Sequence, residues 1–482
     1  MNKKIFWIFV FAIILFGFVT RIYAIHGNNI FFTADQGRDA LYVREIINSH
    51  ALFLRGPETS VRGLFTGPLW YYFIAIGYAV MNGNPAGSVL MLTLLNLSIT
   101  LVLMIIIKRQ VNEKLALLIG FGLQIFWPFF QTSLYGFNPF PLVALSIILI
   151  LLLTKNKYKL ALIPVLLAFN TELAGAIVFL IFYILVGFYQ VLYKKLTRLN
   201  FFVFALGIPV IGIVKIVFDF IKMPKMTINT GLNVFGGTNF IQIFQEFVKM
   251  GVGVFVIIFL IYLFKKGKNN FVNRFVILSF VLIFISFLFF GSNHGWREWQ
   301  TNYIPPLIFI NIIFIIWEFK KWRYFLILII LISQILNFRN NYIAYLKPSN
   351  DRSLLYNQEK VLDWIYTHNE GNGFDLYTYT DSFYDYSYQY LISWYGETKY
   401  GFYPCEYSNF PLSHKYLYIQ GNTNYTSPQL GCDKFRFLII DSKTNGNENR
   451  NWINEFRNET VFLEKTQIGN TTIEKRKVPD IH

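Results

Sequence analysis

The chain has few charged residues and almost no cysteine. Charged side chains make up 15% of its 482 residues, and it contains two cysteines and six histidines. So little charge beside 54% hydrophobic residues excludes an ordinary soluble globular protein. Neither a CxxC pair nor a His-Cys pattern with zinc-binding spacing is present. The apolar residues occur in long runs, which predicts a polytopic membrane protein.

The net charge of +16 comes mainly from lysines and arginines in short loops between the apolar runs. A basic balance of this size is also typical of proteins that bind nucleic acid. Basic loops between spans instead follow the positive-inside rule, which places them on the cytoplasmic side. We therefore expect an integral protein of the cell membrane that contacts membrane lipids and binds no nucleic acid.

About eleven apolar segments come near the length that crosses ~30 Å of hydrocarbon. They are residues 5–25, 86–107, 115–131, 139–153, 159–169, 173–192, 200–218, 247–264, 272–290, 302–318 and 322–338. The first has a basic start, but it is long and no small-residue cleavage site follows, so we predict an uncleaved helix. Segment 159–169 is short and either begins earlier or forms a helical hairpin with the next segment.

The apolar stretch Gly67–Met81 decides the topology. If it stays at the membrane surface and the N-terminus is cytoplasmic, every basic short loop falls on the cytoplasmic side. Those loops carry Lys108, Arg109 and Lys114; Lys155, Lys157 and Lys159; Lys194, Lys195 and Arg198; Lys265, Lys266, Lys268 and Arg274; and Lys320, Lys321 and Arg323. If the stretch spanned, all these loops would lie outside. We therefore predict a juxtamembrane or re-entrant helix in a long first extracytoplasmic loop.

From about Asn340 the sequence is rich in Tyr, Asn and Gly and holds no further membrane-crossing run. "SLLYNQEKVLDWIYTHN" has apolar residues at helical spacing, and "FDLYTYT", "KYLYIQG" and "FRFLIID" are typical of strands. We expect a transmembrane domain over residues 1–339 and an extracytoplasmic α/β domain over 340–482. Cys405 and Cys432 are able to form a disulfide in an oxidising compartment, the alternative being two thiols.

Polar and ionisable residues gather in segments that this topology places on the extracytoplasmic face. They are Asp35, Arg38 and Asp39 in "TADQGRDALYVREI", Asn138 in "YGFNPF", Glu172 in "FNTELAG", and His294, Arg297 and Tyr303 in "SNHGWREWQTNYIPP". A transporter would place such groups near the bilayer midplane on broken helices, and its spans commonly show internal repeats. The spans here show no repeat, so the arrangement favours chemistry at a membrane surface.

The order of these segments resembles the GT-C superfamily of membrane glycosyltransferases, typified by protein O-mannosyltransferases and bacterial lipid A aminoarabinose transferases. The resemblance rests on a first helix, the acidic cluster "TADQGRDALYVREI", then "FTGPLWYYFIAIGYAVMNGNPAG", "YGFNPFPLVALS" and "HGWREWQTNYIPPL", in that order over about residues 1–340. It implies a mainly α fold: a GT-C-like bundle with juxtamembrane helices in the first extracytoplasmic loop, followed by the C-terminal α/β domain.

The resemblance implies an inverting transfer of a sugar from a polyprenyl-phosphate donor to a hydroxyl of a protein, lipid or glycan. The family's general base is an early aspartate of the first loop, which matches Asp35, and a carboxylate suits proton removal from the attacking hydroxyl. Contacts to the donor phosphate are expected from Arg297, His294 and Tyr303. The alternatives are a pair of Arg297 with Glu298 or Asp35 that only secures the loop, and a structural His294.

Asp35, Arg38 and Asp39 allow more than one arrangement. On a helix that begins near Ala34, both carboxylates share a face beside Arg38, and Asp39 is a second catalytic carboxylate or only the partner of Arg38. The alternative is a helix N-terminus capped by Asp35, with Asp39 exposed. A carboxylate pair is also able to bind a divalent metal ion, which some relatives contain, but no histidine lies nearby to complete such a site.

The chain departs from the family pattern at two positions. Asn138 stands where many relatives have an acidic residue, so an acid role does not carry over, and we expect Asn138 to bind substrate together with Arg38 and Glu172. Gly67 stands where the aminoarabinose transferases have a lysine, and either Arg62 supplies that charge to the donor phosphate or Arg297 alone does. Glu172 is alternatively a helix cap.

Two functions of other classes share parts of this pattern. A transporter or lipid flippase has the same hydropathy, but it predicts the repeats and broken helices that the sequence lacks. A membrane-anchored binding protein would act through the C-terminal domain and depend on residues 345–482. No glycine-rich nucleotide loop is present, which agrees with a lipid-linked sugar donor rather than a nucleotide-linked one.

Overall fold

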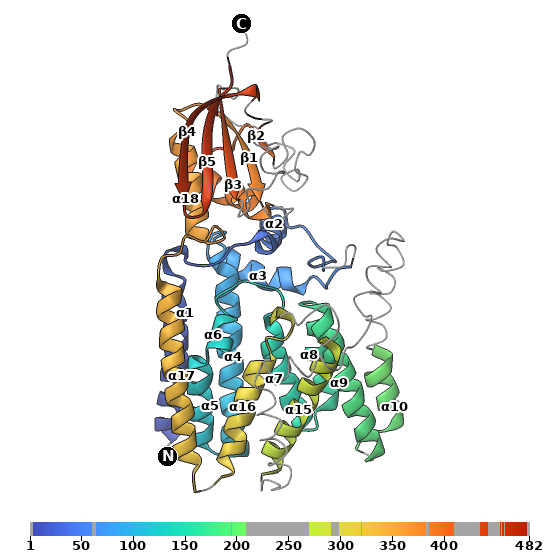
Figure 1. Ribbon diagram of the computed structural model, residues 1–482. Coiled ribbons are helices and arrows are strands. Elements are labelled where there is room, and N and C mark those ends of the chain that lie inside the picture. The colour runs from blue at the N-terminus through green and yellow to red at the C-terminus, as the bar shows by residue number, and fades with distance from the viewer. Residues whose placement is uncertain are drawn as a thin grey trace.

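The chain folds into a bundle of apolar helices that carries a β-sheet region at one end (Figure 1). The computed structural model describes residues 3–59, 64–193, 195–208, 269–290, 298–319, 321–380, 385–408, 434–441, 454, 456 and 458–479. Five helices of this described part are long and apolar enough to cross a membrane: α1 (Lys3–Ala24), α4 (Ala86–Gln110), α9 (Leu173–Leu192), α15 (Asn270–Phe290) and α17 (Arg323–Leu346). At about 1.5 Å per residue, each covers ~30 Å or more. The chain is an integral membrane protein, as predicted.

Shorter helices complete the bundle. They are α5 (Glu113–Ile125), α6 (Trp127–Gln131), α7 (Pro141–Thr154), α8 (Tyr158–Ala168), α10 (Arg198–Asn200) with the π-helix η2 (Phe201–Gly207), and α16 (Ile304–Trp317). The extended backbone of Phe126, followed by Pro128 in the first turn of α6, divides the predicted span 115–131 in two. The other predicted spans coincide with helices, except that 247–264 and the end of 200–218 lie outside the described residues. The number of spans stays a prediction.

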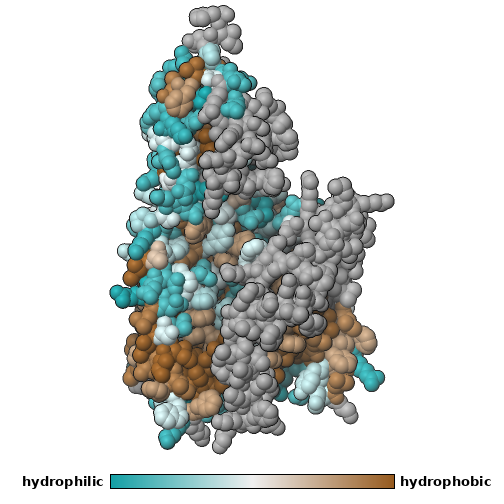
Figure 2. Space-filling model, in the orientation of Figure 1, coloured by the Kyte–Doolittle hydropathy of each residue, from teal (hydrophilic) through white to brown (hydrophobic). Residues whose placement is uncertain are grey.

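On the face that Figure 2 shows, apolar side chains gather in a band across the lower part of the bundle, and hydrophilic side chains predominate at the end with the sheet. Of the five long helices, α1 and α17 are the least buried within the protein. Phe11 of α1 is 67% exposed and Leu328 of α17 is 55% exposed. Contiguous apolar side chains of this kind are stable in contact with lipid rather than water.

Two helices lie at the end of the bundle that carries the sheet, α2 (Ala34–Ser49) and α3 (Leu69–Val80). α3 runs across the long helices rather than along them (Figure 1) and has 12 residues, too few to cross a membrane. This agrees with the predicted surface position of Gly67–Met81. The N–H of Gly67 donates to the carbonyl of Phe169 (2.9 Å), and a β-carbon at Gly67 would collide with Asn170. A larger residue at position 67 would have to displace the Asn170 side chain.

The C-terminal region forms a mixed five-stranded sheet with strand order β2-β1-β3-β5-β4. The strands are β1 (Phe374–Thr380), β2 (Glu406–Ser408), β3 (Phe435–Asp441), β4 (Val461–Ile468) and β5 (Thr471–Lys477). β1 pairs in parallel with β2 and β3, whereas β5 pairs antiparallel with β3 and β4. β1, β3 and the helix α18 (Leu355–Thr367) confirm the predicted helix and two of the three predicted strands. The third, "KYLYIQG", lies outside the described residues.

Two other expectations about this region have different outcomes. Cys405 is disulfide-bonded, and the only other cysteine of the sequence, Cys432, lies outside the described residues. α17 continues to Leu346, past the predicted domain boundary at residue 339, and that boundary stays a prediction.

The C-terminal region is attached to the segment that leads into α2. The N–H of Phe32 donates to the carbonyl of Ser353 (2.7 Å), and the N–H of Leu355 donates to the carbonyl of Ile30 (2.9 Å). A second contact involves α2 itself, which packs on α19 (Tyr386–Leu391) so closely that a β-carbon at Gly37 would collide with the α19 backbone. The position of α2 therefore depends on residues more than three hundred positions away in the sequence.

Gly37→Ala tests this packing. Alanine normally stabilises a helix over glycine by about 1 kcal/mol, but here we expect a net loss of about 1–3 kcal/mol, because the added methyl group has no space. The measurement is the melting temperature of the detergent-purified protein, followed by intrinsic fluorescence. Ser49→Ala, at an exposed position of α2, is the control. A melting temperature that rises for Gly37→Ala would contradict the close approach of α2 and α19.

Candidate functional site

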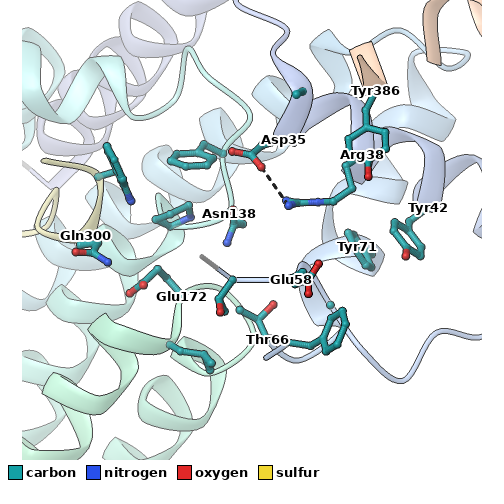
Figure 3. Close-up of a pocket in the computed structure, with 18 residues that line it drawn as sticks. Asp35, Arg38, Tyr42, Glu58, Thr66, Tyr71, Asn138, Glu172, Gln300 and Tyr386 are labelled. Atoms are coloured by element: carbon teal, nitrogen blue, oxygen red, sulfur yellow. Dashed lines mark hydrogen bonds and ion pairs between the residues drawn. The ribbon is translucent and has the colours of Figure 1, made fainter. Parts of the chain in front are cut away.

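A cavity of ≈ 420 Å³ lies at the end of the bundle next to α2 and α3 (Figure 3). Four residues predicted for the site line it: Asp35, Arg38, Asn138 and Glu172. They come from α2, from the loop before α7 and from the N-terminus of α9. Figure 3 shows Asn138 and Glu172 on the side of the cavity opposite Tyr42 and Tyr71. Segments far apart in the sequence thus bring these predicted residues together.

The start of α2 places Asp35 in the cavity. Thr33 is the N-cap, and a capping box joins it to Gln36, whose side-chain oxygen accepts the N–H of Thr33 (2.7 Å). The Thr33 hydroxyl also hydrogen-bonds the hydroxyl of Tyr135 (3.0 Å), which fixes this end of α2 to the loop before α7. The helix therefore begins at Ala34, as predicted, while the alternative of Asp35 as the cap is wrong. The Asp35 side chain is instead 54% exposed.

Arg38 lies between the two carboxylates. Its Nη1 is 3.1 Å from Oδ1 of Asp35, and its Nη2 is 2.8 Å from Oδ1 of Asp39. The indole N–H of Trp70, on α3, donates to the other oxygen of Asp39 (2.7 Å). Asp39 is only 2% exposed, so both of its oxygens are engaged behind Arg38 rather than facing the cavity. The chain Trp70–Asp39–Arg38–Asp35 thus fixes the guanidinium at the cavity wall.

The burial of this group shifts two pKa values. Burial raises the pKa of Asp39 to about 6, although Arg38 and the Trp70 hydrogen bond act in the opposite direction. Burial alone would lower the pKa of Arg38, but the carboxylates of Asp39 and Asp35 outweigh it and raise that pKa above its usual value. Arg38 therefore stays charged at every physiological pH, whereas the Asp39 carboxyl takes up a proton at a higher pH than a free aspartate does.

The opposite wall of the cavity is polar. Glu172 is the N-cap of α9 and accepts the N–H of Gly175 (2.5 Å), so the predicted cap role and a place in the cavity hold together. Burial raises the pKa of Glu172, while the Gly175 N–H and the side chain of Gln300 oppose that rise. Asn138 donates to the carbonyl of Thr171 (2.5 Å). This wall presents amide and carboxyl groups that are suited to binding hydroxyls.

Several lining residues were not predicted. Tyr42 and Tyr71 stack with their ring centroids 4.9 Å apart, and Trp299 and Tyr386 add two further aromatic side chains. Glu58 of the first loop is an additional carboxylate in the lining. Trp299 lies within a quoted motif, but no periodicity or spacing in the sequence links Tyr386 of the C-terminal region with α2. Aromatic faces with few polar groups between them are typical of small-molecule sites.

The other predicted phosphate-binding residues have different outcomes. His294, Arg297 and Arg62 lie outside the described residues and stay predictions, although Trp299 and Gln300, which follow Arg297 closely in the sequence, line the cavity. Tyr303 is described and has no solvent exposure. Its hydroxyl hydrogen-bonds Ser286 (2.7 Å), and its ring packs edge-on against Phe179. In this arrangement Tyr303 lies within the bundle and is not among the cavity-lining residues.

Asp35 and Asp39 do not fit the metal ion that some relatives contain. The Arg38 guanidinium lies between them, and the second oxygen of Asp39 is taken by Trp70. In the described part of the chain, no three His, Cys, Asp or Glu side chains come together as a metal-ligand group. Arg38 therefore occupies the position between these carboxylates that a bridging cation would need.

The fold of the chain matches solved structures of the family that the sequence resembles, which confirms the predicted resemblance at the level of the fold. It is similar to two crystal structures of ArnT from Cupriavidus metallidurans, a lipid A aminoarabinose transferase. The structure bound to undecaprenyl phosphate matches with a TM-score of 0.58 at 11% identity, over 98% of each chain. The apo structure matches with a TM-score of 0.55 at 12% identity, over 97% of each chain. No protein-family model and no curated protein matches the sequence.

Substitutions of the two aspartates should destabilise the protein to very different extents. Asp39→Asn removes the buried partner of Arg38, so we expect a loss of about 3–5 kcal/mol. Asp35→Asn breaks an exposed ion pair and should cost about 1 kcal/mol or less. Thermal melting of the two purified variants against wild type measures the difference. Equal melting temperatures for the two variants would contradict the buried position of Asp39.

Proposed function

We propose that the protein is an inverting glycosyltransferase that moves a sugar from a polyprenyl-phosphate donor to an acceptor hydroxyl at the extracytoplasmic membrane face. The observation that carries this proposal is the cavity, in which the exposed carboxylate of Asp35 lies 3.1 Å from the fixed guanidinium of Arg38. This cavity lies at the hydrophilic end of a GT-C-type bundle. The undecaprenyl phosphate bound in one of the similar ArnT structures supports a lipid-phosphate donor.

In the proposed reaction, the acceptor oxygen forms a bond to the anomeric carbon of the donor sugar. Its proton passes to the carboxylate of Asp35, the general base. The bond between the anomeric carbon and the phosphate oxygen breaks, and polyprenyl phosphate leaves with the negative charge. Because attack and departure take place on opposite sides of the sugar, the configuration inverts. The transferred group is a hexose or a pentose.

The leaving phosphate needs cations and hydrogen-bond donors beside it. Arg38 is one such cation on the described wall of the cavity, and it reaches this position already paired and ordered. We assign the remaining phosphate contacts to Arg297 and His294, with Arg62 from the first loop. We assign Tyr303 an indirect role: it lies within the bundle and supports the loop that carries these residues.

We assign Asp39 to the positioning of Arg38 rather than to proton transfer, because both of its oxygens already accept hydrogen bonds. Asn138 and Glu172, on the opposite wall, are suited to binding hydroxyls of the sugar or the acceptor. The half-buried ring of Tyr42, which is stacked on Tyr71, offers an apolar surface to the sugar ring. The proposed topology has a cytoplasmic N-terminus and an extracytoplasmic C-terminal region, which follows from the basic loops.

Asp35→Asn should reduce sugar transfer by about 10²–10⁴-fold, because the amide cannot take the acceptor proton. The assay follows the release of polyprenyl phosphate in membranes that contain donor and acceptor, together with the amount of folded protein. Glu464→Gln, an exposed position on β4, is the control and should keep full activity. Full activity of Asp35→Asn would show that Asp35 is not the general base.

The pKa of Asp39, about 6, predicts an acidic limit to activity. Below this pH the protonated carboxyl releases Arg38, so the transfer rate should fall as the pH drops through about 6. Trp70→Phe removes a hydrogen bond that lowers this pKa and should move the limit to higher pH. Tyr72→Phe, which removes a hydroxyl elsewhere on α3, should leave it in place. Coincident pH profiles for Trp70→Phe and wild type would contradict this role of Asp39.

A further inference from the structure

A second chamber, of ≈ 340 Å³, lies on the other face of α2. Its lining comes from the C-terminal half of α2, the end of α3 and the turn after it, α19, the π-helix η4 (Ile392–Gly396) and α20 (Glu397–Tyr400). The chamber and the Asp35 cavity have no lining residue in common. At about 100° per residue, Asp35, Arg38 and Tyr42 lie on one side of α2, while Arg44 and Asn48 lie on the other. The proposed reaction makes no use of this chamber.

Aromatic side chains form the floor of the chamber. The rings of Tyr390 and Trp394 stack at a centroid distance of 6.1 Å, and Tyr78 meets Tyr390 edge-on at 5.9 Å. Hydrogen bonds hold these rings in place: the Tyr390 hydroxyl donates to the carbonyl of Gly83 (2.5 Å), and the Trp394 indole donates to the carbonyl of Asn82 (2.8 Å). Tyr78 and Tyr390 are 1% and 2% exposed, so they support Trp394 from beneath, and the half-buried ring of Trp394 is the apolar surface that a ligand meets, without ordering cost at binding.

The rim of the chamber carries amide and hydroxyl groups. Asn48, Asn82 and Thr398 line it and are exposed. In the described part of the chain, none of these three side chains makes a hydrogen bond, so all three are available to a ligand. Amide and hydroxyl groups both donate and accept, which matches the hydroxyl groups of a sugar.

The charged groups of the chamber are already paired. Nη2 of Arg44 lies 2.8 Å from Oε2 of Glu397 and 3.2 Å from the hydroxyl of Tyr403. A phosphate or a cation would have to break this pair, so the chamber favours a neutral ligand. An aromatic floor with neutral donors and acceptors around it suits a ligand that has an apolar face and a ring of hydroxyls.

We propose that this chamber binds a neutral sugar residue of a glycan acceptor, an inference that rests on the proposed function and specifies its acceptor class. α2 separates the chamber from Asp35, and a helix with its side chains is about 10–12 Å across. One sugar residue therefore cannot occupy both sites. The acceptor is an oligosaccharide whose terminal residue reacts near Asp35 while a more distant residue is held on Trp394.

Binding is tested with the full-length Asp35→Asn protein in lipid nanodiscs, which binds without turnover. The probes are neutral oligosaccharides of different lengths, released from surface glycans of cells that carry the enzyme and end-labelled with a fluorophore. Thr398→Trp fills the chamber and should weaken binding at least tenfold. Thr367→Trp makes the same substitution at an exposed position of α18 and should have no effect. Asn48→Ala removes one rim amide and should weaken binding severalfold, which covers the case in which Thr398→Trp fails to fold.

Three results would overturn the proposal: equal affinities of Thr398→Trp and Thr367→Trp, no binding of any neutral fraction, or preference for phosphorylated oligosaccharides of the same length. Transfer assays with the wild-type protein separate this failure from failure of the proposed function. If the protein transfers sugar to a protein or lipid acceptor, and Thr398→Trp leaves that rate unchanged, only the proposal of a glycan acceptor is rejected. Absence of any transfer from a polyprenyl-phosphate sugar removes the proposed function itself.

Discussion

The arrangement of the site depends on the pairing of one buried guanidinium. Arg38 is only 14% exposed and cannot lose its charge, so it needs carboxylates beside it. Asp39 supplies the buried partner and is itself held by Trp70, which ties α2 to α3. Asp35 remains at the cavity surface on the other side of the guanidinium. One ion-pair chain thus orders a cation and leaves a carboxylate accessible in the same cavity.

The rest of the molecule keeps this chain in place. Tyr135 and the Thr33–Gln36 capping box fix the start of α2, and the turn between α8 and α9 holds the segment that leads into α3. The C-terminal region bonds to the segment before α2 and contributes Tyr386 to the cavity. It is therefore part of the site rather than a separate binding module. Because several elements of the fold contact the side chains of such a site, these side chains are held in place before a ligand binds.

Elements with a local signal could be predicted from the sequence. The apolar runs predicted most of the helices. The spacing of three residues from Asp35 to Arg38 and of four from Asp35 to Asp39 predicted that these side chains lie together on α2. The Trp70–Asp39 bond and the place of Tyr386 could not be predicted, because both arise from tertiary packing between distant segments. β5 carries two charged residues, Glu474 and Arg476, for which no pattern in the sequence predicts burial. In the structure both are buried, and they pair with each other (3.0 Å).

The most direct test of the central claim is mass spectrometry of the surface glycans, glycolipids and glycoproteins of cells with and without the gene. The account predicts that deletion removes a mass of one hexose or pentose from one class of these molecules, and that reintroducing the gene restores it. The polyprenyl-phosphate sugar should accumulate in the deleted cells, because its consumer is missing. Identical spectra and an unchanged pool of lipid-linked sugar in the two strains would contradict a glycosyltransferase.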